Sequence, residues 1–539
     1  MSYSGIGAAL ALLLSACGGG GSSGSGTTIN TGTGTTTTTT PTDVTIQLDA
    51  AATGTAVNPL VLGSNVQWVN GGDNLLLASS LTFDSSMVPL VQTMAPTVLR
   101  YPGGQQSDLY DWTLGIGPLG SRGTNLQAVS NTPQITYMGS GEMMQLDATV
   151  GSAALFTVNV VTGTAAEAAA WVQQMNVTGL ASPSGQVLPP VTYWEIGNEP
   201  YLSNPNGSNP NDCEIAPAAY AAAVNAFVPA MRAVDPTIKI GIALSNDRRN
   251  GIVATAVNCQ GFAATVLGAL TQSIDFISLH NAYLPYSSGA DQPAAVEFAA
   301  AMGSTQTIAA DFAAMRSLLQ NYPGLQSLPF AVTEYNALFS PNSSSAYYYA
   351  NASPMGALYV ADALRLFAGD DEVLMANTWS LSGNDHWGAI HPPASGVAPY
   401  GRPVYEVFRL FSQALKGVRL APTVASPNFD APSLGFSAAA SALPLVTTLA
   451  TEVTASTGAT VRLIMINKDY SNAHVAGVSI ANGTVSAATL SSLTAANVLE
   501  TDDLPGSLVR SDSTLTVTAP MIVNLPAHSI ELLTLTLAP

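Results

Sequence analysis

Eight apolar segments recur between residues 59 and 381, and helical patterns lie between several of them. Several segments are continuous apolar runs, which is typical of strands that helices cover. Strands that alternate with helices predict an α/β fold with parallel strands. Eight of them favour a (β/α)8 TIM barrel over a doubly wound sheet, because no glycine-rich dinucleotide turn follows the first. The candidate strands are Pro59–Trp68, Thr97–Pro102, Ala154–Val160, Val191–Asn198, Ile238–Ser245, Phe276–Tyr283, Phe330–Asn336 and Val373–Leu381.

Helix signals separate several of these strands. The segment Thr164–Glu167 has the form of a capping box, which predicts that a helix begins there. Pro217 suits the first turn of another helix, and Pro229 inside that helix predicts a kink or a break. Further helices are expected over Ala294–Asn321 and Met355–Phe367.

Beyond Gly417 the pattern changes to short strands separated by Gly, Asn, Asp and Pro turns. This pattern predicts that residues 418–539 form a C-terminal β-sandwich after a barrel domain at 58–417. Segment 44–57, ahead of the barrel, is expected to add a strand to the sandwich. Candidate strands of the sandwich are Val461–Asn467, Leu515–Ala519 and Ile530–Leu537.

The first 16 residues are interpreted as an export signal, because Ala8–Leu14 is apolar but too short to span a bilayer. Leu14–Cys17 resembles the bacterial lipoprotein box, which implies cleavage before Cys17 and a lipid on its sulfur. Residues 17–43, rich in Gly, Ser and Thr, would be a flexible tether. The expected location is the periplasmic or cell-surface side of a membrane.

One feature departs from that pattern, since no Lys or Arg precedes the apolar core of the signal. Either the true start lies upstream or the free amine supplies the charge. An ordinary secretory signal with an incidental cysteine at position 17 is the alternative.

The charge balance limits the partners. A net charge of -19 with only 15 Lys and Arg argues against nucleic acid, whose phosphates need cationic contacts. It also argues against electrostatic docking on an anionic membrane, so the only predicted membrane contact is the lipid at Cys17. An uncharged polymer such as a polysaccharide is compatible with this balance.

Two further cysteines, Cys213 and Cys259, are expected to form a disulfide, because an exported protein meets an oxidising compartment. A metal site is disfavoured, since two isolated thiols without a nearby histidine do not complete a ligand set. No metal or cofactor is predicted.

Two glutamates lie where strands four and seven give way to loops. Glu199 follows Val191–Asn198, and Glu334 lies near the end of Phe330–Asn336. Only 9% of the residues are charged, so carboxylates at the ends of apolar strands stand out. The carboxyl ends of barrel strands meet at one face, where active sites form. Two carboxylates that converge there are what hydrolysis of a glycosidic bond requires.

Motifs around these strands are similar to glycoside hydrolase family 51 of clan A. The members are mainly α-L-arabinofuranosidases, with some endoglucanases, so the resemblance implies a retaining O-glycoside hydrolase with a carbohydrate substrate. It covers the barrel and agrees with a terminal sandwich. Two places depart from the family pattern, at Pro200–Tyr201 and at Thr333–Asn336, and both put the identity of the sugar in doubt. The matching motifs are Leu99–Gly104, Tyr110–Trp112, Gly115–Pro118, Val158–Val160, Gly163–Val172, Asp275–His280 and Val404–Ser412.

The resemblance also implies roles. Glu334 would be the nucleophile, Glu199 the acid/base, and Asn198 a ligand of the sugar 2-hydroxyl. Retention predicts that the two carboxyl groups lie only ~5–5.5 Å apart. Other clan A activities, β-xylosidase or endo-β-glucanase, are alternatives, as is a non-catalytic carbohydrate-binding lipoprotein.

Supporting residues are assigned from position. Arg100 either pairs with a buried Glu195 or holds Glu334 ionised, and the second role is favoured. Strand six ends at His280 and Tyr283, where the clan places hydrogen-bond partners of the nucleophile; core packing is the alternative for both. Trp379, at the end of strand eight, would be the floor of the sugar subsite or a core residue. His386 and Trp387 follow it and are candidates for the rim.

Overall fold

The computed structural model describes residues 42–539, apart from 129, 181–184, 186, 204–208, 210, 246–256, 384, 457 and 502. Residues 42–539 belong to one compact unit. The predicted signal segment 1–16, the lipidation site Cys17 and the tether up to residue 41 lie outside the described residues. Among the described helices, none is both long enough and apolar enough to cross a membrane.

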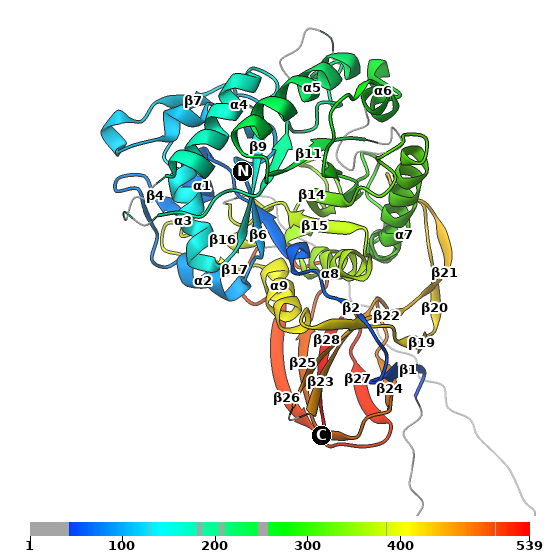
Figure 1. The fold of residues 1–539 in the computed structure, drawn as a ribbon. Coiled ribbons are helices and arrows are strands. Elements are labelled where there is room, and N and C mark those ends of the chain that lie inside the picture. The colour runs from blue at the N-terminus through cyan, green and yellow to red at the C-terminus, as the bar shows by residue number, and fades with distance from the viewer. Residues whose placement is uncertain are drawn as a thin grey trace, which may run out of the picture. The chain divides into compact units, whose positions relative to one another are not determined.

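The predicted (β/α)8 barrel is confirmed (Figure 1). Its strands are all parallel and follow one another around the sheet, and a pairing between β12 and β14 closes it. The sixth strand is interrupted, so that β12 and β13 share one position. The strands are β3 (Gly63–Asn65), β6 (Val98–Tyr101), β9 (Ala153–Val158), β10 (Tyr193–Ile196), β11 (Lys239–Ala243), β12 (Phe276–Ser278), β13 (Ala282–Pro285), β14 (Phe330–Leu338) and β15 (Val373–Thr378).

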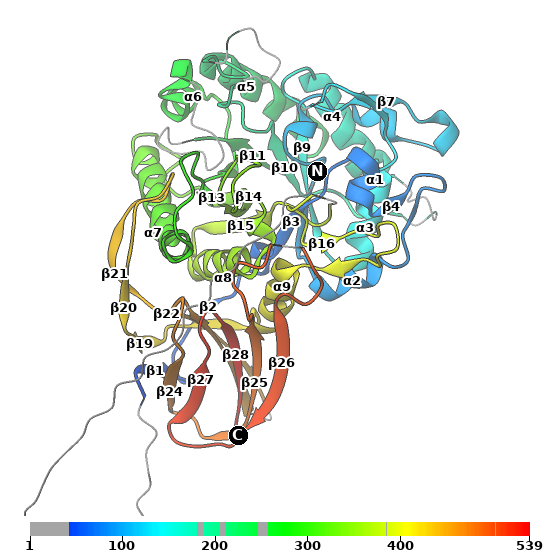
Figure 2. The ribbon, with the colours of Figure 1, turned by 180° about the vertical axis from the view of Figure 1, so that it is seen from behind.

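Helices surround these strands (Figure 2). The expected capping box is present, since the Thr164 hydroxyl accepts from the Glu167 amide and the Glu167 carboxylate accepts from the Thr164 amide. Pro229 does not split its helix, which runs without interruption from Pro217 to Val234. The helices are α1 (Val69–Asn74), α2 (Val88–Met94), α3 (Ser140–Val150), α4 (Ala165–Val172), α5 (Pro217–Val234), α6 (Phe262–Ala269), α7 (Ala294–Leu319), α8 (Pro354–Gly369) and α9 (Pro403–Ala414).

The barrel interior is built in two layers. An apolar cluster made of Val98, Leu155, Phe276, Ala331 and Met375 fills its lower end. Because side chains alternate along a strand, the residues two positions further on point into the same interior. These residues are polar and buried, and they support the site above them: Arg100, Thr157, Ser278, Thr333 and Asn377.

Two sheets form the sandwich that was expected at the C-terminus, and an apolar core packs between them. One sheet has the order β19-β1-β24-β27, and the other β2-β18-β22-β23-β28-β25-β26. The candidate strand Leu515–Ala519 is wrong, because β26 ends at Leu515 and the next strand begins at Met521. The bounds are β1 (Val44–Asp49), β2 (Thr55–Ala56), β18 (Val418–Leu420), β19 (Thr423–Ala425), β22 (Val446–Ala455), β23 (Gly458–Asn467), β24 (His474–Ala481), β25 (Val485–Thr494), β26 (Val509–Leu515), β27 (Met521–Leu525) and β28 (Ile530–Leu537).

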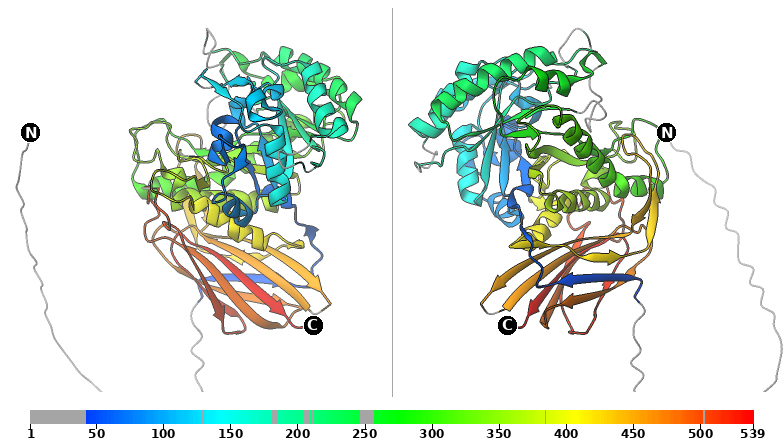
Figure 3. Two further views of the ribbon diagram at one scale, coloured as in Figure 1. Left: turned by 90° about the vertical axis from the view of Figure 1, so that its left-hand side faces the viewer. Right: turned by 45° about the vertical axis from the view of Figure 1, so that its right-hand side comes forward.

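Strand β1 comes before the barrel in sequence but pairs inside the sandwich (Figure 3). It is parallel to β24, with Val44 opposite Ala476, and antiparallel to β19, with Thr45 opposite Ala425. Its side chains are alternately buried and exposed, so one face joins the sandwich core. The remaining two-stranded ribbons are β4 (Leu76–Leu77) with β5 (Thr82–Phe83), β7 (Thr124–Leu126) with β8 (Pro133–Ile135), β16 (Ile390–His391) with β17 (Tyr400–Gly401), and β20 (Asn428–Ala431) with β21 (Ala440–Pro444).

A buried charged cluster joins the barrel to the sandwich. The Asp362 carboxylate, on α8, accepts hydrogen bonds from Thr305 of α7, Arg365 of α8 and Thr447 of β22. The Lys468 ammonium, just after β23, lies 3.3 Å from it. Asp362 and Lys468 are both buried, so this ion pair is removed from solvent.

Candidate active site

The chain leaves strand geometry directly after β10, which decides where Asn198 and Glu199 point. Strict alternation would send these neighbours to opposite faces. Instead, Gly197 has φ +74° and Glu199 has φ +37°. A side chain at Gly197 would meet Val160 at 2.3 Å, so this bend requires glycine. Asn198 and Glu199 are both buried, and both contact groups of the same site.

Strand β14 delivers Glu334 by a second irregularity. The register between β14 and β15 shifts between Val332 and Tyr335, which marks a β-bulge. Thr333 and Glu334 lie inside this interval, and both make contacts in the barrel interior, Thr333 with Glu195 and Glu334 with Arg100. The nucleophile candidate is therefore positioned by a bulge that a simple alternation pattern does not reveal.

Arg100 contacts both of the carboxylates between which the sequence left a choice. Its Nε lies 2.7 Å from Glu195 Oε2, and its Nη1 lies 2.7 Å from Glu334 Oε1. Its Nη2 donates to Asn198 Oδ1 at 2.9 Å. Asn65, which the sequence analysis did not single out, also accepts from Nη1. One buried guanidinium thus contacts four side chains, carried by β3, by β14, and by β10 with the residues directly after it, and it balances two carboxylates.

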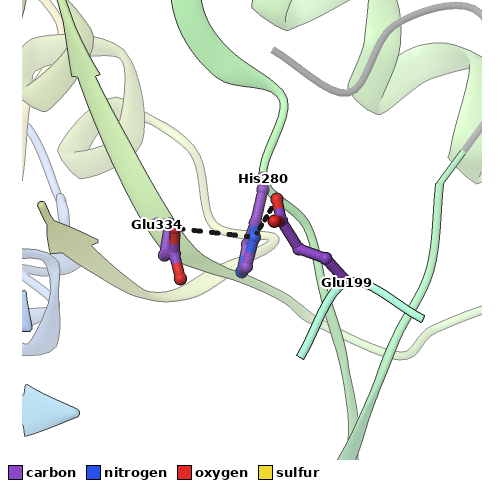
Figure 4. Close-up of side chains that lie close together, drawn as sticks. All are labelled: Glu199, His280 and Glu334. Carbon is purple, nitrogen blue, oxygen red and sulfur yellow. Dashed lines mark hydrogen bonds and ion pairs between the residues drawn. The ribbon is translucent and has the colours of Figure 1, made fainter. Parts of the chain in front are cut away.

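His280 and Tyr283 contact different glutamates. The Tyr283 hydroxyl donates to Glu334 Oε2 at 2.9 Å, whereas His280 Nδ1 lies 2.8 Å from Glu199 Oε1 and 3.9 Å from Glu334 Oε2 (Figure 4). The clan resemblance implied that both residues would hydrogen-bond Glu334. Tyr283 does so, whereas His280 makes its shorter contact with Glu199. Donors from Arg100 and Tyr283 stabilise negative charge on Glu334.

The hydrogen bonds of Thr333 define where the proton of His280 lies. The Thr333 hydroxyl donates its one proton to Glu195 Oε1 at 2.8 Å. It must therefore accept from His280 Nε2, which lies 2.9 Å away. With Nε2 protonated, the short contact between His280 Nδ1 and Glu199 requires one shared proton, held either by the carboxyl or by the ring. Sequence reasoning did not identify Thr333 in this role.

The electrostatic surroundings favour a Glu199–His280 pair that keeps this shared proton. Burial raises the pKa of Glu199, the charge on His280 lowers it, and the charge on Glu334 raises it again, so that the net pKa lies above its ordinary value. Burial lowers the pKa of His280, but the charges of Glu334 and Glu199 outweigh burial and raise the net pKa. The Glu199–His280 pair is thus suited to hold a proton that it can later release.

A cavity of about 260 Å³ opens above these groups. Glu199 and Glu334 line it, and Asn198 lies beneath them with its Nδ2 buried and without a hydrogen-bond partner among the described residues. A buried amide donor without a partner costs free energy unless a ligand accepts from it. Other residues that line the cavity are Gln67, Gly104, Gln105, Gln106, Leu202, Tyr283, Trp379 and Trp387.

Trp379 forms part of the cavity wall, beside Gly104. Asn336 donates to the Trp379 carbonyl, which fixes the backbone there. Gly104 has φ +50°, and a Cβ at this position would lie 2.7 Å from Trp379 Cη2 and 3.3 Å from Glu334 Oε1. Only glycine permits this approach of the backbone to the site.

We therefore expect Gly104→Ala to lower kcat/KM by about 10- to 100-fold, because the added methyl displaces Trp379 and crowds Glu334. The variant should remain folded, since the change adds one methyl group at the edge of a cavity. Steady-state kinetics and circular dichroism would test this. An unchanged kcat/KM would show that Trp379 and Glu334 need not keep their positions. Gly151→Ala, at a position with nothing within 4 Å of the added atom, is a matched control for positive φ.

The side chains of Glu199, His280 and Glu334 are close enough to hold a metal ion, since one donor atom of each lies within 4.8 Å of the other two. Among the described residues, this is the group with that property. The same atoms are hydrogen-bonded to Arg100, Tyr283 and to each other. One oxygen of Glu199 thus lies within 4.8 Å of one oxygen of Glu334. This closeness is suited to two carboxyl groups acting on opposite sides of one bond.

The predicted disulfide between Cys213 and Cys259 is present. Cys213 is adjacent to Glu214, whose backbone amide donates to the Leu202 carbonyl. Leu202 lies three residues after Glu199, so the disulfide adjoins the segment that follows Glu199. Burial and the charge of Glu199 raise the pKa of Glu214 to about 7. Asp108, also buried, is a second carboxyl whose surroundings include Glu199. The sequence around Glu214 and Asp108 does not indicate a role for either acid, because the surroundings of each are formed by residues distant in the chain.

Comparison with known proteins yields related sequences and a related fold. Residues 90–184 match the model of the α-L-arabinofuranosidase 1 domain. The chain is 26% identical over 219 residues to a probable α-L-arabinofuranosidase C of Aspergillus flavus, covering 39% of this chain and 42% of that protein. It is also 26% identical over 262 residues to an intracellular exo-α-(1→5)-L-arabinofuranosidase of Streptomyces lividans, covering 45% of this chain and 38% of that protein.

The fold resembles that of the α-L-arabinofuranosidase of Thermotoga maritima, solved as an arabinose complex. The TM-score is 0.76 at 19% sequence identity, over 92% of this chain and 100% of the other. The sequence matches span less than half of the relatives' length, and the structural match concerns the fold.

Proposed function

We propose that this chain, a relative of the glycoside hydrolase family 51 α-L-arabinofuranosidases, is a retaining glycosidase that removes α-L-arabinofuranosyl groups. The observation that carries the proposal is the pair of buried carboxyl groups with oxygens within 4.8 Å of each other. Retaining enzymes hold their carboxyl groups ~5–5.5 Å apart, whereas inverting enzymes need ~6.5–9.5 Å to admit a water molecule. The close pair therefore favours double displacement.

In the first step, Glu334 attacks the anomeric carbon and forms a glycosyl ester. The bond to the leaving oxygen breaks, and the proton shared by Glu199 and His280 moves to that oxygen. The carboxylate of Glu334 is oriented for attack by Arg100 and Tyr283. The free Nδ2 of Asn198 would donate to a sugar hydroxyl next to the reacting carbon.

In the second step, the charged Glu199 takes a proton from water, and the water oxygen attacks the same carbon. The ester bond breaks and Glu334 leaves as a carboxylate, ready for the next cycle. Two inversions give net retention. While Glu199 lacks the shared proton, His280 Nδ1 offers only a lone pair to it. The proton taken from water restores the hydrogen bond between the two groups.

The assignment to arabinofuranosyl groups is supported by the matching domain model and by the two sequence relatives. The expected substrate is a plant-type polysaccharide or oligosaccharide, and the cavity walls of Trp379 and Trp387 suit the apolar face of a sugar. β-Xyloside or β-glucan hydrolysis remains the alternative because residues Pro200–Tyr201 and Thr333–Asn336 depart from the family pattern.

A panel of aryl glycosides tests the proposal. The p-nitrophenyl α-L-arabinofuranoside should be cleaved fastest, and proton NMR of the first product should show the configuration of the substrate. Clear turnover of the β-xyloside beside none of the arabinofuranoside would replace the sugar assignment. A product of inverted configuration would exclude the double displacement.

The pH dependence should reflect the raised pKa of Glu199. Because the first step needs a protonated Glu199, kcat/KM should fall on the alkaline side, with a midpoint above the ordinary carboxyl value of about 4.3. In Glu199→Ala, azide can replace the water without a general base. The rate of the azide reaction with a good leaving group should therefore lack the alkaline fall. If the fall persists in this variant, another group is responsible for it.

We further propose that residues 1–16 direct export and that Cys17 carries a lipid anchor, on the basis of the sequence pattern alone. Radioactive palmitate should label the wild-type protein expressed in a bacterium that processes lipoproteins, and the label should be absent from Cys17→Ser. Equal labelling of both would contradict the anchor.

A further inference from the structure

A continuous series of aromatic rings leads from the catalytic cavity to the protein surface. The Tyr283 ring, whose hydroxyl contacts Glu334, meets the edge of Trp387 with centroids 6.0 Å apart. Trp387 lies 5.1 Å from His386. His386 contacts both Tyr348 at 4.7 Å and Tyr349 at 5.1 Å. Each step is about the width of one sugar ring.

The series ends in an unusually exposed side chain. Tyr349 is 51% exposed, and it is the one aromatic residue among the exposed large hydrophobic side chains of the described part of the chain. Tyr283 and His386 are buried, whereas Trp387 and Tyr348 are half-buried and Tyr349 is exposed, so Trp387, Tyr348 and Tyr349 are the rings that solvent reaches. A tyrosine that only filled the core would not leave half of its surface in water.

The two loops that carry these rings follow the last two strands of the barrel. Tyr348 and Tyr349 follow β14, the strand of Glu334, and His386 and Trp387 follow β15, the strand before Trp379. Both loops therefore leave the face of the barrel where the reaction occurs. A substrate that extends beyond the reacting sugar meets these loops first.

The charge of this region limits what it can bind. Burial lowers the pKa of His386, so the imidazole is neutral near pH 7 and offers no cation to an acidic polymer. The exposed Asp385, whose Oδ1 accepts from the Trp387 amide at 3.1 Å, adds negative charge beside the rings. The net charge of -19 repels acidic chains as well. Neutral sugar rings, with apolar faces that stack on aromatic side chains, fit this surface.

We propose that Trp387, Tyr348 and Tyr349, which all pack against the buried His386, bind the uncharged glycan chain that extends beyond the scissile bond, so that the enzyme selects oligosaccharides and polysaccharides over short glycosides. The proposal rests on the proposed glycosidase function. It concerns the sugars attached to the leaving oxygen, because an enzyme that removes a terminal group holds the rest of the substrate on that side. The occupant is a neutral pentose or hexose chain.

The test compares two substrates in Tyr349→Ala. One is p-nitrophenyl α-L-arabinofuranoside, which has no sugar beyond the bond, and the other is a linear arabinofuranosyl oligosaccharide of at least four residues. Relative to wild type, the ratio of kcat/KM for the oligosaccharide to that for the aryl glycoside should fall about 5- to 10-fold, mainly through KM, as expected for the loss of one stacking contact. Tyr349→Phe keeps the ring and should restore the ratio. Val177→Ala, an exposed apolar side chain on a different element, is the control for general surface effects.

An unchanged ratio in Tyr349→Ala would overturn the proposal, as would an equal loss on both substrates. A second measurement does not need turnover. Titration calorimetry on Glu334→Gln with the oligosaccharide should give weaker binding when Tyr349→Ala is added, and equal affinities would overturn the proposal. If wild type leaves every α-L-arabinofuranoside intact, the proposed sugar specificity is wrong. The affinities of Glu334→Gln, with and without Tyr349→Ala, for neutral xylo- and gluco-oligosaccharides would then test the aromatic binding site independently.

Discussion

Replacing Glu334 with glutamine is expected to lower kcat for the aryl arabinofuranoside by on the order of 10⁵-fold, because an amide cannot form the glycosyl ester. The fold should persist, since glutamine has nearly the same shape. Its carbonyl oxygen can still accept from Arg100, and its amide nitrogen can donate to the Tyr283 hydroxyl oxygen. Steady-state kinetics, with circular dichroism to verify folding, measures this effect.

The matched control is Glu406→Gln, which makes the same chemical change on α9, where the carboxylate pairs with Arg409 three residues along the helix. A surface pair of this kind contributes ~0.2–1 kcal/mol to stability, and kcat should not change. Retention of more than a few per cent of the activity in Glu334→Gln would exclude Glu334 as the nucleophile. In that case the closeness of Glu334 to Glu199 would need another explanation.

Removing Asp362 is expected to have the largest effect on stability. In Asp362→Ala the Lys468 ammonium remains buried without its counter-ion, and breaking such a pair costs about 3–5 kcal/mol. Thr305 and Thr447 also lose their acceptor, so contacts of α7 and β22 are weakened together. Urea unfolding followed by tryptophan fluorescence would show the transition at a lower midpoint.

The control is the double variant Asp362→Leu with Lys468→Met, which removes the two fully buried charges and should recover most of the loss, because an apolar pair needs no compensation and the partly exposed Arg365 can turn to water. Equal instability of the single and double variants would show that packing rather than charge determines the effect. In both variants, kcat/KM of the folded protein should stay near the wild-type value, since the cluster lies between the barrel and the sandwich.

The contribution of Asp362 to the free energy of unfolding should also depend on pH. Burial raises its pKa, but the charges of Arg365 and Lys468 outweigh burial and hold the pKa well below the ordinary value. The carboxylate is thus favoured in the folded state, so its stabilisation is complete above the unfolded pKa of about 3.9 and is lost as the pH falls through the lower folded pKa. The difference between wild type and Asp362→Ala should accordingly shrink in acid.

The barrel could be predicted from the sequence because its strands are apolar runs at regular intervals, and this signal is local. The same count placed the two candidate catalytic glutamates on strands four and seven. The interruption of strand six between β12 and β13 was not predicted, because Phe276–Tyr283 was counted as one strand. The polar residues His280 and Asn281 lie at the break and were its only local sign.

The supporting residues were harder to predict because their roles depend on geometry. The two proposed roles of Arg100 were treated as alternatives, yet a planar guanidinium with five donors can serve Glu195 and Glu334 at once. Thr333 was recognised only as a neighbour of Glu334, because alternation places neighbours on opposite faces. The bulge in β14 removes that restriction, and no residue type signals it.

Strand β1 has a consequence for the order in which the protein is completed during synthesis. It emerges from the ribosome before the whole barrel, but its first partner, Ala425 of β19, emerges about 380 residues after Thr45, and β24 follows later. At ~5–20 residues per second, the strand waits between about 19 and 76 s without a partner. Over that time it presents an open hydrogen-bonding edge beside the growing chain, so a chaperone that shields residues 44–49 should raise the yield of folded enzyme.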